Sequence, residues 1–272
     1  MKILLTGHMG FIGEHLYNHL STDASIEDNV LKHKHTVIGL DLKNGHDLLT
    51  CDLNYDVDIV IHLAGLAQVR ESLANPTKYW DVNVIASKRL FDAFPNTRII
   101  YASSSSAYEP EKNPYAFSKF ALDKIAPAHS LGLRFTTVWC EGGRDGMFMT
   151  KLFENNINYI TEHSRDFIHV SDVVSVIDML MTKDTTGVLD VGCGISNSLK
   201  TLVDLAGIKN YEYKDGNVYE RMDNCANIFD MIQLKDLGWQ PKVNVVEYIK
   251  NKYHLTSDSG LNIMNTTMEN TK

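Results

Sequence analysis

The sequence predicts an α/β protein with a doubly wound parallel sheet and a small C-terminal lobe. Three observations lead to this prediction. Short apolar runs alternate with longer helical patterns, a glycine-rich turn follows the first run, and the alternation breaks after about Glu141. Such alternation is the signature of repeated βαβ units, whose right-handed crossovers place the strands in one parallel sheet.

The elements of the first part follow from this alternation. The predicted strands are Lys2–Thr6, Thr36–Asp41, Asp58–Leu63, Thr97–Ser103 and Phe135–Trp139. The predicted helices are Phe11–Leu20, Pro76–Ala93 and Tyr115–Leu131. The polar stretch Ser21–Lys34 extends the first crossover, and we expect it on the surface.

After about Glu141 the regular alternation of apolar runs and helical patterns ends. A glycine-rich loop is followed by the segment Arg165–Val170, a helix near Asp172–Met181, short strands near Val188–Val191 and a helix near Ser198–Ala206. We therefore expect a first domain over residues 1–140 and a smaller lobe over 141–255, which can receive crossing segments. Thr256–Lys272 is rich in Asn, Thr and Ser and is predicted to be a frayed tail.

Composition excludes several classes of function. The chain has 272 residues and a formal net charge of −8, which argues against a nucleic-acid binder because such a protein needs a basic patch. Four cysteines without CxxC pairing do not predict a metal site; they are Cys51, Cys140, Cys193 and Cys225. No run approaches the roughly 18 apolar residues of a spanning helix, so we expect a soluble, cytoplasmic protein with no membrane partner.

The turn TGHMGFIG, Thr6 to Gly13, joins the first strand to the first helix. Its first glycine permits a tight turn, the second lets the backbone approach a pyrophosphate, and the third allows close helix–strand packing. The helix N-terminus offers unpaired N–H groups and a positive dipole end to phosphates. We predict a dinucleotide site that includes Gly7, Met9, Gly10, Phe11, Ile12 and Gly13.

An acidic residue follows at the end of the second strand. Asp41 can accept hydrogen bonds from both adenosine ribose hydroxyls and would repel a 2′-phosphate, so NAD is favoured over NADP. The alternative is a strand-end carboxylate that faces water. Residues after the next strands are predicted to line the adenine and ribose sites: Asp52, Leu53, Leu63, Ala64 and Gly65.

A phenol and an ammonium share one face of a later helix. Tyr115 and Lys119 are four residues apart in YAFSK. A nearby lysine cation lowers the pKa of a tyrosine and favours the phenolate as a base, and the same lysine can hold the nicotinamide ribose. The preceding strand ends in a run of serines, Ser103 to Ser106, where open α/β sheets bind ligands. A serine-rich loop without function is the alternative.

Together these motifs resemble the extended short-chain dehydrogenase/reductase family, in particular its NAD-dependent nucleotide-sugar epimerases. The resemblance covers most of residues 1–255 and implies a Rossmann-like first domain and a nucleotide-sugar-binding lobe. It rests on TGxxGFIG, HLAG from His62, VRESLANP from Val69, YASSSSAY from Tyr101, YAFSK from Tyr115, RDFIHVSDVV from Arg165 and LGWQP from Leu237.

The resemblance implies a mechanism and its residues. Hydride leaves sugar C4 for NAD, the resulting 4-keto intermediate turns over in the pocket, and the hydride returns to its other face. Tyr115 is the general base and then the acid, Ser104 relays or steadies the proton, and Lys119 tunes Tyr115. Related dehydratases and decarboxylases carry carboxylates in the serine stretch, where this chain has Ser105 and Ser106, so epimerisation is favoured.

The resemblance also implies a substrate site. Leu133–Met147 is similar to a segment of UDP-glucuronate 4-epimerases, in which Thr137 falls on a sugar position and Arg144 on the arginine that meets the uronate carboxylate. Trp139–Glu141 and Asp145-Gly146 depart from that pattern. UDP-glucuronate or a related UDP-hexose is therefore the expected substrate.

Further substrate contacts are expected from Ser105 and three more arginines. Arg165 matches an arginine that holds the diphosphate, and Arg70 occupies a substrate-side position. Arg221 is the candidate for a second diphosphate arginine, although it is out of register. Each arginine has the alternative role of a surface ion-pair partner.

Two other functions stay open at this point. One is another sugar-nucleotide oxidoreductase, such as a 4-keto reductase or a dehydratase, and the other is a non-catalytic dinucleotide sensor. The family also implies a homodimer, in which Pro76–Ala93 and Tyr115–Leu131 of each subunit form a four-helix interface.

Overall fold

The computed structural model describes residues 1–22, 24–27, 30–33 and 35–261. A six-stranded sheet forms the centre of the molecule, in the order β11-β7-β6-β5-β1-β4, and every neighbouring pair is parallel. The predicted doubly wound α/β fold is thereby confirmed. The six strands are β1 (Lys2–Thr6), β4 (Thr36–Leu40), β5 (Ile59–His62), β6 (Arg98–Ser104), β7 (Leu131–Phe135) and β11 (Gly187–Val191).

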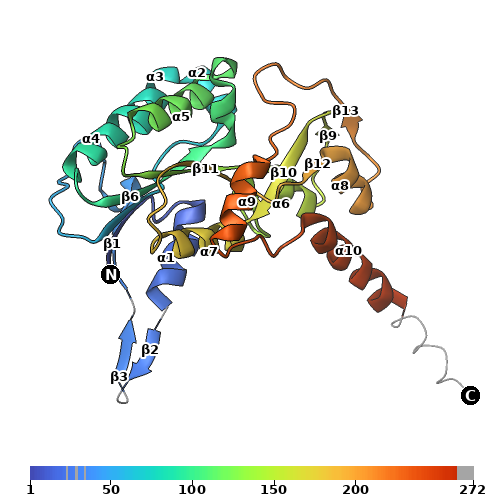
Figure 1. Ribbon diagram of the computed structural model, residues 1–272. Helices are drawn as coiled ribbons and strands as arrows, with labels where there is room; N and C mark the ends of the chain where they lie inside the picture. The colour runs from blue at the N-terminus through green and yellow to red at the C-terminus, as the bar shows by residue number, and fades with distance from the viewer. Residues whose placement is uncertain (23, 28–29, 34, 262–272) are drawn as a thin grey trace, which may run out of the picture.

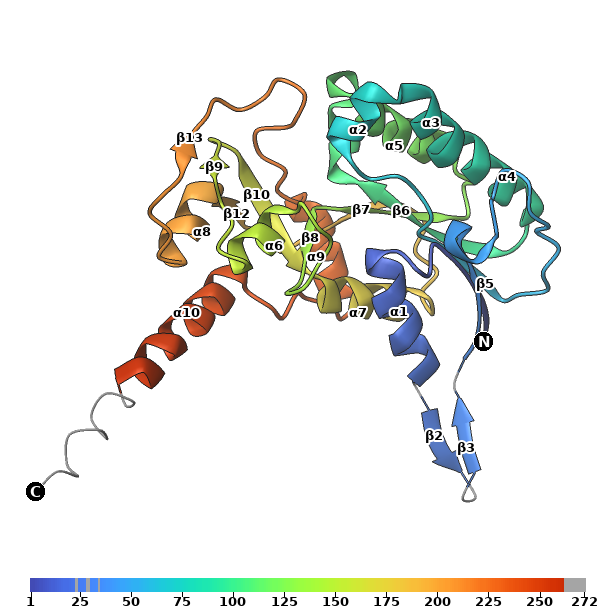
Figure 2. The same ribbon diagram turned by 180° about the vertical axis from the view of Figure 1, so that it is seen from behind.

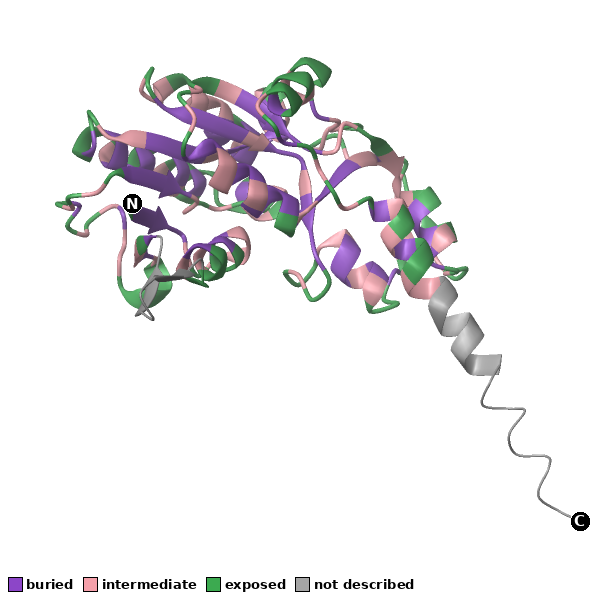
Figure 3. Ribbon diagram, turned by 60° about the horizontal axis from the view of Figure 1, so that its bottom comes forward, coloured by how far each residue is buried: buried purple, intermediate pink, exposed green. Residues whose placement is uncertain are grey.

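Helices cover both faces of this sheet (Figure 1). On one face lie α2 (Val69–Ala74), α3 (Pro76–Trp80), the π-helical turn η2 (Asp81–Ile85), α4 (Ala86–Ala93) and α5 (Pro114–Ile125). On the other lie α1 (Phe11–Thr22), α7 (Val170–Leu180) and α9 (Ile228–Asp236). Apolar side chains of alternate strand residues pack against each layer, for example Ile3 on one side and Leu4 on the other. The strands are consequently buried on both faces (Figure 3).

The second lobe lies beyond the β11 side of the sheet (Figures 1 and 2). A three-stranded sheet of β8 (Thr137–Trp139), β10 (Ser164–His169) and β12 (Ser196–Ser198) and a pair of β9 (Tyr159–Ile160) and β13 (Glu212–Tyr213) form its strands. Its helices are α6 (Phe148–Phe153), α8 (Leu199–Leu205) and α10 (Val245–Leu261). Trp139, Leu202 and Ile249 lie in a separate apolar core. This lobe faces the carboxyl ends of β6 and β7, where ligands bind in open α/β sheets.

Two strand predictions are wrong. Phe135–Trp139 is not one strand, because β7 pairs with β6 and β11 in the central sheet whereas β8 pairs with β10 in the lobe. Thr136 stands between them, and its N–H donates to Val191 O at 3.1 Å. The strand near Val188–Val191 is not part of the lobe, since β11 forms the edge of the central sheet.

Helix ends also differ from the prediction. The helix expected over Tyr115–Leu131 ends at Ile125, because Ala126 is extended and Pro127 follows it. Pro76–Ala93 is helical throughout, with the π-helical turn in its middle. The tail predicted from Thr256 begins inside α10, which runs to Leu261, and residues 262–272 lie outside the described residues.

The crossover after α1 contains an antiparallel hairpin of β2 (Ala24–Glu27) and β3 (Val30–His33), which projects away from the sheet (Figure 1). Residues 23, 28–29 and 34 of the predicted surface stretch lie outside the described residues. Over the described part of the chain, no helix is long and apolar enough to cross a membrane.

Candidate active site

The glycine turn between β1 and α1 is built from backbone alone. Gly7 has a φ of +73°, and a Cβ there would lie 2.5 Å from the Ala64 nitrogen at the end of β5. A Cβ at Gly13 would lie 2.8 Å from the carbonyl carbon of Gly7. Gly10 N–H donates to Gly7 O at 3.0 Å, which closes the turn directly before the helix. The first N–H groups of α1 are therefore presented beside three positions that lack a side chain, Gly7, Gly10 and Gly13, which fits a pyrophosphate.

Asp41 lies beside this turn, as expected of a ribose-binding residue. Its Oδ2 accepts a hydrogen bond from Met9 N at 3.1 Å, and its Oδ1 accepts one from Lys43 N at 2.9 Å. Lys43 Nζ in turn donates to Met9 O at 2.8 Å. A carboxylate has about four acceptor positions, so Asp41 keeps capacity for a ribose diol. These contacts hold the end of β4 against the turn.

The small residues after β5 connect the turn to the catalytic helix. Leu63 N and Ala64 N donate to Thr6 O and Thr6 Oγ1 at 3.1 and 3.4 Å. A side chain on Gly65 would meet Lys119 Nζ at 3.5 Å, so this position borders both the cofactor site and the lysine.

Two of the other expected cofactor residues lie between β4 and β5. Leu53 is buried in the core on the α4 side. Asp52 is exposed, and its Oδ1 accepts a hydrogen bond from Asn54 N at 3.0 Å. Their roles toward adenosine stay predictions.

Asn83 was not found by sequence reasoning, although it supports the site. It lies in the π-helical turn and is buried. Its Oδ1 accepts from Leu66 N at 2.8 Å, while its Nδ2 donates to Leu66 O at 3.0 Å and to Ser118 Oγ at 2.9 Å. One amide therefore ties the loop after β5 to the catalytic helix. The only signal in the sequence is a polar residue within the apolar stretch DVNVI.

The predicted catalytic residues converge. Asn113 caps α5, since its Oδ1 accepts a hydrogen bond from Ala116 N at 2.7 Å, and the helix carries Tyr115 and Lys119 into the interior. The hydroxyl groups of Tyr115 and Ser104 share a hydrogen bond. Burial raises the pKa of Tyr115, while the bond to Ser104 and the charge of Arg144 lower it.

Ser104 is oriented by its own cap. It begins the short helix η3 (Ser105–Tyr108), and its Oγ accepts a hydrogen bond from Ser106 N at 3.1 Å. The proton of Ser104 is therefore free to be donated to the phenolic oxygen, which favours the phenolate. Lys119 Nζ donates to Ala102 O at 2.8 Å, and burial lowers the pKa of Lys119 to about 8. Ser104 and Tyr115 thus form one unit, Lys119 lies one helical turn further along α5, and their roles in proton transfer stay predictions.

Two adjoining cavities lead away from this unit. The smaller, about 180 Å³, is lined by Ser104, Ser105 and Tyr115. The larger, about 550 Å³, lies between α2 and the second lobe and is lined by Arg70, Arg144, Lys151 and Tyr159. Both are lined by Ala67, Val69, Thr137, Arg165 and Glu220. A ligand that spans both cavities would have one end at the catalytic hydroxyls and the rest among cationic side chains.

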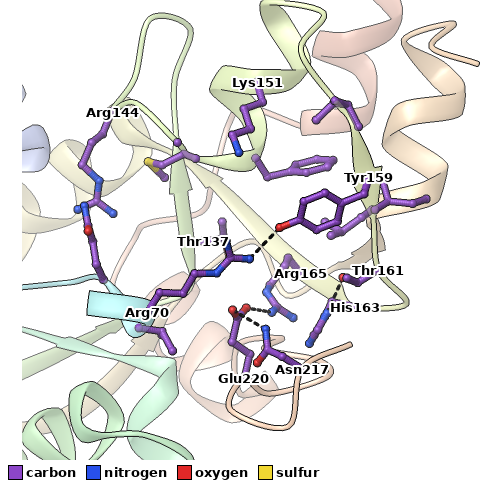
Figure 4. A pocket seen from close by; sticks show the side chains of 18 of the residues that line it. Arg70, Thr137, Arg144, Lys151, Tyr159, Thr161, His163, Arg165, Asn217 and Glu220 are labelled. Carbon is purple, nitrogen blue, oxygen red and sulfur yellow. Dashed lines mark hydrogen bonds and ion pairs between the residues drawn. The ribbon is translucent and has the colours of Figure 1, made fainter. Parts of the chain in front are cut away.

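The side chains of the larger cavity come from both lobes (Figure 4). Arg70 of α2 donates to the Tyr159 hydroxyl at 2.9 Å, and Arg165 of β10 donates to Glu220 Oε2 at 3.1 Å. Arg144 also lines this cavity. The structure thus brings the expected substrate residues Arg70, Arg144 and Arg165 to one cavity.

Arg221 and Thr137 lie closer to the catalytic end. Arg221 donates to Ser105 O at 2.7 Å and to Glu109 Oε1 at 3.2 Å, so it borders the smaller cavity. Thr137 Oγ1 accepts from Asn224 Nδ2 at 3.1 Å. Sequence reasoning missed Glu220 and Asn224, because their place in the site depends on folding of the segment after β13. It also missed Glu109, which directly follows η3 and pairs with Arg221 of that segment.

The fold and the glycine turn together define a dinucleotide-binding protein of the doubly wound α/β class. The family model of the NAD dependent epimerase/dehydratase family matches residues 3–192. The chain belongs to this family, which confirms the resemblance to nucleotide-sugar epimerases and the expected use of NAD.

Individual relatives agree with this assignment. The putative UDP-glucose 4-epimerase of Methanocaldococcus jannaschii is 26% identical, over 91% of this chain and 96% of its own length. Protein CapI of Staphylococcus aureus is 30% identical over 67% of this chain and 70% of its own. MoeE5 in complex with UDP-glucose and NAD superposes with a TM-score of 0.76 at 25% identity, covering 95% of this chain and 99% of the other.

The glycine turn yields a first prediction. Gly13→Ala places a methyl group against Gly7, so we expect a loss of about 1–3 kcal/mol in the free energy of unfolding and much weaker NAD binding. Thermal unfolding and NAD titration measure the two effects. Gly187→Ala is the control, because its Cβ meets nothing within 4 Å; it costs only backbone strain and leaves NAD affinity unchanged. Equal NAD binding by both variants would contradict the assigned turn.

Asp123 lies one further helical turn along the same face of α5 as Tyr115 and Lys119. Its Oδ2 accepts a hydrogen bond from Arg134 Nε at 2.8 Å in a mostly buried ion pair. Burial lowers the pKa of Lys119, and the charge of Asp123 raises it. Lys119 is charged below its pKa of about 8 and neutral above it, so Asp123 extends the pH range over which the ammonium is available.

A second prediction follows for pH dependence. In Asp123→Asn the pKa of Lys119 falls, and we expect the alkaline limb of activity to move roughly one pH unit lower. The pH profile of kcat/KM measures this shift. Asp92→Asn removes an exposed carboxylate that pairs with Lys88 on α4 and should leave the profile unchanged. An unshifted alkaline limb in the first variant would show that Lys119 does not set it.

Proposed function

We propose that this protein catalyses the 4-epimerisation of a UDP-sugar, with UDP-glucuronate or a related UDP-hexose as the substrate. The observation that carries the proposal is that Ser104 and Tyr115 line one of two adjoining cavities, while the other is lined by Arg70 and Arg144, and Arg165 lines both. This arrangement suits an anionic molecule that presents a hydroxyl group to Tyr115.

The chemistry divides between cofactor and protein. Bound NAD supplies a hydride acceptor and donor for sugar C4. Tyr115 takes the proton of the C4 hydroxyl group as the phenolate and later returns it from the phenol. Ser104 donates a hydrogen bond to the same oxygen, and the Lys119 ammonium stabilises negative charge on the phenolate. Residues of the glycine turn hold the pyrophosphate.

The serine stretch favours epimerisation over elimination. Ser105 and Ser106 stand where carboxylates would be needed for acid–base work on a second carbon. Glu109 lines the smaller cavity, but its carboxylate is paired with Arg221 and, at 3.5 Å, with Lys112. Glu220 is paired with Arg165, so among the carboxylates and the phenol that line the smaller cavity Tyr115 is the proton acceptor that is not held in an ion pair.

The ligands of similar structures support a uridine nucleotide as part of the substrate, and they include both a neutral sugar and a uronate. MoeE5 has been solved in complex with UDP-glucose and NAD and with UDP-glucuronic acid and NAD, at 25% and 26% identity. In this chain Arg144 lines the cavity and its charge acts on Tyr115, so it is near enough to the reacting end to receive a carboxylate. A guanidinium binds both oxygens of such a group.

A substrate panel tests the proposal. UDP-glucuronate, UDP-glucose and UDP-N-acetylglucosamine are incubated separately with the enzyme, and the configuration at C4 is measured by NMR. We expect conversion without added cofactor, and a loss of about 10²–10⁴-fold in rate for Tyr115→Phe. Tyr211→Phe is the control, since its hydroxyl bonds Asp204 on the lobe surface.

The same panel separates the alternatives. Arg144→Met should impair conversion of UDP-glucuronate more than that of UDP-glucose if the guanidinium meets the carboxylate. Stoichiometric consumption of NADH or NADPH would instead identify a 4-keto reductase. If NAD is bound and none of the three UDP-sugars is converted, 4-epimerisation of these substrates is excluded.

We also propose that the protein forms a homodimer through α3, η2 and α5. Trp80 and Phe117 on neighbouring helices are 38% and 48% exposed, and their rings stack with centroids 5.8 Å apart. Ile85 adds an exposed apolar side chain to this patch. An exposed aromatic pair of this kind is typical of an interface, and a two-fold axis would join two helices from each subunit.

The dimer gives a further prediction. Phe117→Glu introduces a charge into the patch and should shift the protein from dimer to monomer at micromolar concentration. Gel filtration with light scattering measures the mass. Phe229→Glu on α9, where the side chain is also exposed, should leave the mass unchanged. A wild-type protein that elutes as a monomer would contradict the proposed interface.

A further inference from the structure

Glu220 lies on the segment 214–227, which connects β13 to α9 and arches between the lobe and the helices above the sheet (Figures 1 and 2). Two contacts hold the segment on either side of this residue. Tyr219 O accepts a hydrogen bond from Asn113 Nδ2 at 2.8 Å, and Asp223 forms a parallel bridge with Ser164. The segment therefore places Glu220 where the two cavities meet, and Glu220 lines both.

The Glu220 carboxylate is surrounded by donors (Figure 4). Oε2 accepts from Arg165 Nη2 at 3.1 Å, and Oε1 accepts from Asn217 Nδ2 at 3.0 Å. The hydrogen bond to Tyr159 and the charge of Glu220 raise the pKa of Arg70. A guanidinium group and an amide in contact with one anion, with the charge of a second guanidinium group nearby, also suit a phosphate group. The position between the cavities is therefore an anion site that the protein fills with its own side chain.

We propose that Glu220 is a tethered occupant of the phosphate-binding position, and that the diphosphate of a nucleotide sugar displaces it from Arg165. This inference rests on the proposed function, because a UDP-sugar would lie across the point where the two cavities meet. The side chains of Arg165 and Glu220 are only 14% and 28% exposed, so solvent screens the pair weakly. Two anions at this position would repel each other, and one has to leave.

Arg165 does not depend on Glu220 for its position. Its Nη1 also donates to the carbonyl oxygens of Ser164 and Arg221 at 2.8 and 2.9 Å and to that of Met222 at 3.2 Å. The guanidinium consequently stays in place when the carboxylate moves away. The neighbouring side chains of Val218 and Tyr219 are exposed rather than packed in a core, so the Glu220 side chain can turn away while the backbone of Arg221 and Met222 keeps its contacts to Arg165.

The expected consequence is weaker binding of both substrate and product. In an epimerase these two molecules have the same charge and the same nucleotide, so every contact to the diphosphate that holds the substrate also retards release of the product. A carboxylate that competes for Arg165 lowers both affinities equally and shortens the time that product remains bound. Glu220 would thus raise KM and kcat together.

Isothermal titration with uridine and with UDP tests the inference. Glu220→Gln keeps the shape of the side chain and can still accept a hydrogen bond from Arg165, but it removes the charge. We expect this variant to bind UDP about tenfold more tightly, which corresponds to about 1.4 kcal/mol, and to bind uridine as the wild type does. In turnover of a UDP-sugar, KM and kcat should both fall.

Asp215→Asn is the matched control, because it removes an exposed carboxylate from the same segment that lines neither cavity. It should leave UDP affinity unchanged, and tighter binding in this variant would show a general effect of charge. Should Glu220→Gln unfold, Glu220→Asp retracts the carboxylate while keeping the charge, and UDP binding about two- to threefold tighter than wild type is expected.

Unchanged or weaker UDP binding by a folded Glu220 variant would overturn the inference and show that Glu220 only positions Arg165. If that happens while the wild type binds UDP and epimerises a UDP-sugar, the proposed function stands. A wild type that binds UDP no better than uridine would overturn both.

Discussion

The buried ammonium of Lys119 is the constraint on which the site depends. A charge in the interior is costly unless it is paired and hydrogen-bonded, and here one carbonyl oxygen, that of Ala102, accepts its hydrogen bond while the carboxylate of Asp123 lies one helical turn away. Both require α5 to be docked against β6 in a single register. That register is the one in which Tyr115 reaches Ser104. The energetic demand of the lysine and the geometry needed for proton transfer are therefore met by the same packing.

Polar groups around this lysine reinforce the same arrangement. The buried His62 bridges Thr6 Oγ1 and Ser87 Oγ at 2.7 and 2.8 Å, and burial together with the nearby Lys119 lowers the pKa of His62 to about 3. A neutral imidazole is thus kept beside the ammonium, which avoids repulsion between two cations. Asn83 secures the loop after β5 in the same region. Cofactor loop, catalytic helix and strand ends are joined by side chains that do not themselves touch a substrate.

Local sequence signals predicted the glycine turn, the Tyr115–Lys119 pair and the alternation of strands and helices, because each depends on residues close together in the chain. The right-handed crossover of βαβ units then predicted the parallel sheet. The pairing of strands that are far apart in the chain was harder to predict from the sequence. The chain passes from the central sheet into the sheet of the lobe at Thr136, and an apolar run does not show which strands its two halves will pair with. The return of β11 to the central sheet was missed for the same reason. Glu220 and Asn224 escaped notice because a segment without periodicity carries them, and only tertiary contacts bring them to the cavities.

The side-chain amide of Asn113 connects two parts of the site. Asn113 uses its oxygen to start the helix that carries the catalytic phenol and its nitrogen to hold the backbone of Tyr219. The Asn113 side chain therefore connects the first turn of α5 to segment 214–227, which borders the larger cavity. A displacement of segment 214–227 would therefore act on the residue that caps the helix carrying Tyr115.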